Sequence, residues 1–214
     1  MPEIRKDDDG RERRTIGTPV KVTRNDDGTI GSIYGYPIVY NKWSEDLGGF
    51  VERILPGAAT KALKGSDIRG LKNHESSLIF AREGINLTIT EDKNGVRYEA
   101  TPVDTHNFRE TAKEVDLGLL TGQSFGFRIN ADKWTDLDKD VAKRDITDFE
   151  IIFDVGPVTY PAYPDTSVAL RSLTDIKKDA STGAEATATR AKDESINFKI
   201  DLLNVERTTK GILR

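Results

Sequence analysis

Short apolar runs of strand type, separated by turn signals, fill most of the sequence between about residue 15 and residue 171. Residues 30–40, 78–89, 96–100, 124–129 and 146–159 are rich in β-branched and aromatic side chains, as strands usually are. Turn signals such as Asn94-Gly95 separate these runs. The pattern predicts a β-rich domain. No apolar run approaches the roughly 20 residues needed to cross a bilayer, so we expect no membrane partner.

Two segments are expected to be helical, and both ends of the chain lack a regular pattern. Residues 108–120 carry apolar side chains at intervals of three and four, and residues 58–64 follow the Pro56-Gly57 break, so we predict two helices packed on the sheet. Residues 1–14 are nearly all charged and cannot bury a face, so we expect a flexible arm there. Residues 174–214 are rich in small and polar residues and predict a linker with a flexible tail. The folded domain should therefore span residues 15–173.

Composition excludes several classes of function. The chain has 32 Lys and Arg against 36 Asp and Glu, and this mildly acidic balance argues against nucleic acid as the main partner. It has no cysteine, which removes disulfides, thiol catalysis and thiolate metal sites. Its two histidines are not spaced as metal ligands. We expect neither a metal ion nor a cofactor.

The remaining route to covalent catalysis is a hydroxyl activated by a neutral imidazole, which only His74 or His106 can supply. Ser124 is the most informative hydroxyl, because it lies between Gly122 and Gly126 where small neighbours leave room for a substrate carbonyl. The letters match Gly-x-Ser-x-Gly, but the residues after the serine alternate as in a strand. A nucleophile elbow instead requires a strand, a sharp turn and a helix.

Five blocks, in order between about residues 31 and 173, resemble the prohead proteases of tailed phages, the family of the HK97 maturation protease. One block contains Asn73-His74-Glu75, which is similar to the Asn-His-Asp around the family's catalytic histidine. Another contains Gln123-Ser124-Phe125-Gly126-Phe127, which is similar to the family's segment around the nucleophile. The remaining blocks are residues 35–41, 50–58 and 154–163.

The resemblance implies an α+β, mainly β fold like that of the herpesvirus maturation protease, a small β-barrel flanked by helices. It implies that Ser124 is the nucleophile and His74 its general base. Asp154 stands where the family has Glu and is the first choice to orient the imidazole. His106 is an alternative third member, since herpesvirus enzymes use a second histidine. Asp104 and Glu150 are further carboxylates ranked below Asp154.

The resemblance further implies a serine endopeptidase that acts inside the procapsid in the host cytoplasm. Its substrates would be the scaffold, the major capsid protein and the enzyme itself, and self-association is open. One rival is a catalytically inactive scaffold or assembly module of the same fold, which would not need Ser124, His74 and a carboxylate to converge. Another is an unrelated serine hydrolase such as an esterase, against which the missing elbow argues.

Overall fold

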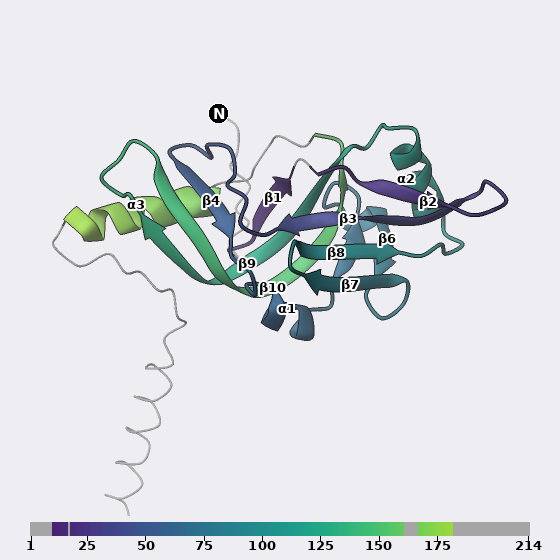
Figure 1. The fold of residues 1–214 in the computed structure, drawn as a ribbon, viewed down its shortest axis with the longest axis horizontal. Coiled ribbons are helices and arrows are strands. Elements are labelled where there is room, and N and C mark those ends of the chain that lie inside the picture. Colours follow the sequence, from purple (N-terminus) through teal and green to yellow (C-terminus); the bar gives the residue numbers. More distant parts are fainter. Residues whose placement is uncertain (1–9, 17, 161–166, 182–214) are drawn as a thin grey trace, which may run out of the picture.

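The computed structural model describes residues 10–16, 18–160 and 167–181, and its strands form two sheets (Figure 1). The molecule is elongated, with helix α3 (Ser167–Ser181) at one end and the turn between β2 and β3 at the other (Figure 1). The strands are β1 (Glu12–Ile16), β2 (Lys21–Arg24), β3 (Ile30–Val39), β4 (Phe50–Ile54), β5 (Arg69–Leu71), β6 (Ile79–Arg82), β7 (Leu87–Asp92), β8 (Gly95–Ala100), β9 (Gly122–Thr135) and β10 (Ala142–Val158).

The larger sheet is built around the long antiparallel pair of β9 and β10. Its order is β1-β9-β10-β5-β6, and β4 also pairs with β10, in parallel. Strand β5 pairs in parallel with β10 farther along, from Asp154 to Val155. The strands that carry the predicted nucleophile and carboxylate are therefore neighbours, and the chain leading to His74 runs beside them.

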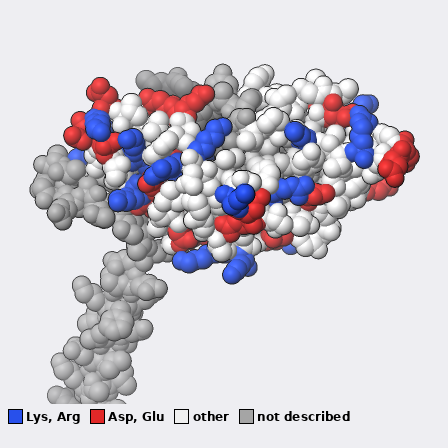
Figure 2. All heavy atoms as spheres, viewed as in Figure 1, with Lys and Arg blue, Asp and Glu red and all other residues white. Residues whose placement is uncertain are grey.

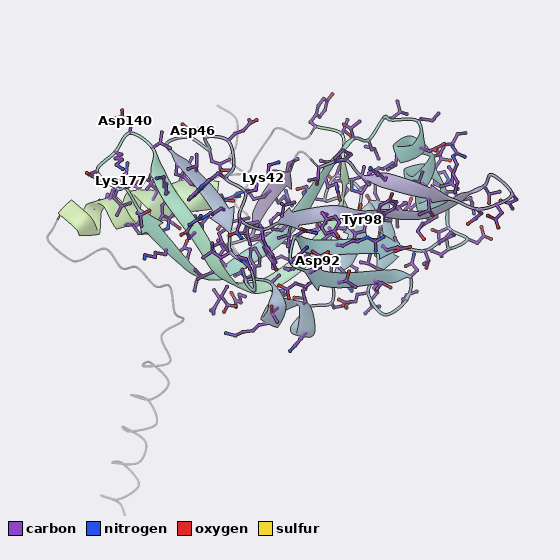
Figure 3. All side chains as sticks on the ribbon, viewed as in Figure 1. Lys42, Asp46, Asp92, Tyr98, Asp140 and Lys177 are labelled. Atoms are coloured by element: carbon purple, nitrogen blue, oxygen red, sulfur yellow. The ribbon has the colours of Figure 1, made fainter. Side chains whose placement is uncertain are left out.

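The smaller sheet has the order β2-β3-β8-β7 and holds the fully buried Tyr98 on β8 (Figure 3). Helix α2 (His106–Asp116) buries one apolar face, and its cap is Thr105, whose side chain accepts a hydrogen bond from the Phe108 amide. Helix α1 (Thr60–Gly65) is short, and a 3-10 turn, η1 (Ser76–Leu78), follows the loop that contains His74. On the face seen in Figure 2, acidic and basic side chains are interspersed.

The main core is aromatic along β9. Phe125 and Phe127 stack with ring centroids 4.7 Å apart, and both contact the ring of Phe149 on β10. These phenylalanines alternate with Ser124 and Gly126, so one face of β9 packs the core while the other carries the candidate nucleophile. Burial of the phenylalanines thus fixes which way the serine points.

A second buried feature is ionic. We call Glu12, Arg14, Glu52, Asp132 and Arg144 the charge cluster; all five side chains are 6% exposed or less. The Arg144 guanidinium donates to Asp132, Glu12 and Glu52 at 2.8 to 3.2 Å, and Arg14 donates to Glu52 and Glu12 at 2.5 to 2.6 Å. Buried charges persist only when paired in this way. The charge cluster attaches β1 to β4, β9 and β10.

Several sequence expectations are confirmed and others are wrong. The mainly β fold with helices is confirmed, but the strands of the described residues form two sheets and do not close into a barrel. The run at residues 78–89 is two strands, because residues 83–86 turn the chain between β6 and β7. The segments expected at 30–40, 96–100, 124–129 and 146–159 are strands over most of their length. Those at 58–64 and 108–120 overlap α1 and α2, but α2 begins two residues earlier and ends four residues earlier than expected.

The expected flexible ends need correction where the structure describes them. Residues 12–14 belong to β1, because Glu12 and Arg14 are neutralised by partners distant in sequence. Residues 174–181 continue α3, which packs Leu173 against a small cluster that includes Phe50 and Trp134. Residues 1–9 of the expected arm and 182–214 of the expected tail lie outside the described residues.

Candidate active site

Three elements bring Ser124, His74 and Asp154 together. Ser124 lies near the start of β9, Asp154 lies on β10, and His74 lies in the loop after β5. The His74 Nε2 atom is 2.6 Å from Ser124 Oγ, and its Nδ1 atom is 2.5 Å from Asp154 Oδ1. The imidazole thus bridges a hydroxyl and a carboxylate through its two nitrogens. This arrangement can pass the hydroxyl proton to the ring while the carboxylate fixes the tautomer.

Two glycines make space for this arrangement. Ser124 is opposite Gly156 in the β9–β10 ladder, and Gly126 is opposite Asp154. These four residues therefore share one face, with the two functional side chains on one diagonal and the glycines on the other. A Cβ atom on Gly126 would lie 2.5 Å from Asp154 Oδ2, and one on Gly156 would lie 2.0 Å from the Leu71 carbonyl oxygen. Gly126 admits the carboxylate, and Gly156 admits the chain that leads to His74.

The loop that carries His74 has an unusual backbone. Asn73 and His74 both have positive φ, 54° and 60°, a conformation that costs non-glycine residues energy and tends to occur at functional sites. Asn73 is fixed to the end of β10 from several directions. Its backbone amide donates to the Pro157 carbonyl, its side-chain oxygen accepts from the Thr159 amide at 2.8 Å, and its side-chain nitrogen donates to Thr159 Oγ1. Asn73 therefore holds the neighbouring imidazole in position.

A cleft of about 360 Å³ opens beside the three residues. It is lined by Arg13, Thr15, Asn73, His74, Ser124, Val158, Thr159 and Tyr160. Asp154 and Ser124 are almost completely buried, while the His74 side chain is 12% exposed. Across residues 10–16, 18–160 and 167–181, no group of three or more His, Cys, Asp or Glu side chains could hold a metal ion. The chemistry that the described residues supply is that of a hydroxyl, an imidazole and a carboxylate.

Comparison with known proteins identifies the family. The family model of the caudovirus prohead serine proteases matches residues 18–179, which is most of the chain. The chain belongs to the caudovirus prohead serine protease family. Among solved structures, the capsid assembly protease gp21 of bacteriophage T4 is similar, with 14% identity, a TM-score of 0.47 and coverage of 69% of this chain and 96% of that one. A search of curated proteins found no match.

The sequence blocks that resemble the family also converge in space. The two blocks that contain His74 and Ser124 meet the block that begins with Asp154, although residues 161–163 of that last block lie outside the described chain. In the described part of this prohead protease family member, no helix has the length and hydropathy that a bilayer span requires.

The alternative third members lie elsewhere. His106 is exposed at the start of α2 and Asp104 is exposed just before it, where it pairs with Arg109. Glu150 is on β10 but faces Arg128, with 3.6 Å between its Oε2 atom and the guanidinium. Asp154 is the carboxylate that contacts His74.

Sequence reasoning did not assign the roles of four contributors to the site. Asn73 had a usable signal, since asparagine tolerates positive φ better than most residues and precedes the histidine directly. The sequence shows glycine at positions 126 and 156, but it does not show the atoms that a side chain there would meet, because those atoms belong to other strands. The Arg14 carbonyl oxygen, which accepts a hydrogen bond from Ser124 Oγ at 2.8 Å, gave no sequence signal because any residue carries a carbonyl.

Proposed function

We propose that this chain is a serine endopeptidase that processes scaffold protein, capsid protein and itself during phage head maturation. The observation that supports the proposal best is the continuous contact from Ser124 Oγ through the His74 ring to Asp154, at 2.6 and 2.5 Å. The family membership supplies the biological setting, the inside of a procapsid in the host cytoplasm.

The proposed mechanism is acyl transfer through serine. His74 Nε2 takes the Ser124 hydroxyl proton as Oγ attacks the scissile carbonyl carbon, and the resulting imidazolium gives that proton to the leaving amine. Asp154 accepts the hydrogen bond from His74 Nδ1 and stabilises the imidazolium. Water then attacks the acyl-enzyme with His74 again as base, which releases the second product and restores Ser124.

The test is proteolysis by the full chain beside a Ser124→Ala control. Purified protein is incubated alone, with scaffold protein and with capsid protein, and the products are identified by mass spectrometry. We expect shortened species from the wild type and none from Ser124→Ala. Reaction with short esters but not with these proteins would instead favour an esterase, and no reaction by either route would refute the proposal.

A further inference from the structure

Strand β1 lies against the candidate active site. It pairs antiparallel with the part of β9 that carries the nucleophile, and Thr15 is opposite Ser124 in the ladder. Its side chains alternate: Glu12 and Arg14 enter the charge cluster, whereas Arg13 and Thr15 line the cleft beside His74 and Ser124. An extended segment therefore covers the nucleophile from the edge of the sheet, and Ser124 is only 1% exposed.

The backbone of β1 also competes for the nucleophile's proton. Ser124 Oγ donates a hydrogen bond to the Arg14 carbonyl oxygen at 2.8 Å. A hydroxyl has one proton to donate, so Ser124 cannot donate to Arg14 and to His74 Nε2 at the same time. While β1 is bound, the proton that His74 must abstract is directed at a peptide carbonyl. The Arg14 carbonyl oxygen faces the hydroxyl as an acceptor, so this contact does not place the carbonyl carbon for attack.

We propose that β1 is an internal occupant of the peptide-binding edge of β9, and that it keeps the protease inactive until it is displaced. This inference rests on the proposed function. An extended substrate would add to the same edge as an antiparallel strand, which is a common mode of peptide recognition. The family match begins at residue 18, after β1, so this strand precedes the part of the chain that the family model covers.

The charge cluster holds β1 in place together with its ladder to β9. Arg14 supplies one of its two guanidiniums and bridges Glu12 of β1 to Glu52 of β4. The pKa of Arg14 is raised, because the attraction of Glu52 and Glu12 outweighs the opposing effect of burial. Replacing Arg14 with Glu would leave the charge cluster with four carboxylates and only the Arg144 guanidinium to neutralise them, so β1 would be expelled. The substitution changes nothing in residues 18–214.

The test uses the full chain with Arg14→Glu and a fluorophosphonate probe that reacts with activated serines. We expect this variant to react at least about tenfold faster than wild type. This is the change expected if β1 is released less than about a tenth of the time in wild type and all of the time in the variant. Arg24→Glu is the matched control, because it reverses an exposed arginine that pairs with Asp116 and belongs neither to the charge cluster nor to the lining of the cleft. It should react at the wild-type rate. Ser124→Ala gives the background.

A peptide probe tests the binding site itself. A synthetic peptide with the sequence of residues 10–16 should slow the Arg14→Glu variant back toward the wild-type rate, and the same peptide carrying Glu at position 14 should not. An Arg14→Glu variant that is folded by circular dichroism but reacts no faster than wild type would overturn the inference and leave the proposed function intact. Failure of every form to react above the Ser124→Ala background would overturn both.

A milder variant covers the case in which Arg14→Glu does not fold. Arg14→Gln keeps the length of the side chain and removes only its charge, so it should release β1 partly and give an intermediate rate. If both variants unfold, β1 is an integral part of the core rather than a displaceable occupant, and the inference is wrong.

Discussion

Replacing Gly126 with alanine should disconnect Asp154 from His74 without touching any of the three functional side chains. The new Cβ atom would lie 2.5 Å from Asp154 Oδ2 and 3.3 Å from its Cγ, whereas ordinary contacts are 3.4–4 Å. The carboxylate must therefore retreat, and its other oxygen is the atom that lies 2.5 Å from His74 Nδ1. Nothing else in the proton relay changes.

The size of the effect follows from that displacement. The carboxylate has to move by about 1 Å, and a misplacement of that size can lower a rate about a hundredfold, or by about 2.7 kcal/mol in activation free energy. The same crowding should lower the free energy of unfolding by about 1–3 kcal/mol, as overpacking usually does. The loss should be in kcat rather than KM, because the carboxylate acts on the transition state.

The assay compares kcat and KM for cleavage of a capsid or scaffold segment, together with unfolding in urea. Gly65→Ala is the control, because no atom lies within 4 Å of the Cβ position at that end of α1. In an Asp154→Ala background the clash is gone, so Gly126→Ala should then cost little stability although activity stays low. Wild-type kcat in a stable Gly126→Ala protein would refute the role assigned to Asp154.

Four further predictions concern Asp154, Asn73 and the charge cluster. Asp154→Asn should keep the fold and lower kcat about 10⁴-fold, since an amide does not hold the required imidazole tautomer; circular dichroism and steady-state kinetics check this. Asn73→Ala should lower kcat between about tenfold and a hundredfold, because the loop at positive φ loses its side-chain hydrogen bonds to Thr159, and wild-type kinetics would contradict this. Burial raises the pKa of Glu12, but the combined attraction of Arg144 and Arg14 lowers it by more. The pKa of Glu12 in the folded state is therefore below the ordinary 4.5. Its stabilising contribution is therefore complete above pH 4.5 and is lost as the pH falls through the folded-state pKa. Thermal melts should show this loss on acidification, and Glu12→Gln should show less of it. Arg144→Met should destabilise the chain by about 3–5 kcal/mol in urea unfolding, since three buried carboxylates would retain only one guanidinium.

Local sequence patterns predicted the segments of β3, β8, β9 and β10 and located α1 and α2 approximately, but they gave no strand at β1, β2, β4 or β5. Alternation at residues 124–129 placed Phe125 on one face and Ser124 on the other, and this is how β9 is built. The same reasoning failed at residues 78–89, where one apolar run is two strands because the chain turns at Gly84, which has positive φ. Periodicity reports which residues alternate, but it does not show where an alternating run folds back.

The sequence by itself determined the chemical repertoire: no cysteine, two histidines, and motifs whose order resembles one protease family. Only the tertiary structure decided which carboxylate contacts His74, because Asp154, Asp104 and Glu150 differ in what lies opposite them on neighbouring elements. The tertiary structure also explains why a charged segment forms β1: Arg14 pairs with Glu52, 38 positions away, and Glu12 pairs with Arg144, 132 positions away. An isolated charge is most stable in water, and burial becomes favourable only when folding brings opposite charges to it from distant parts of the chain.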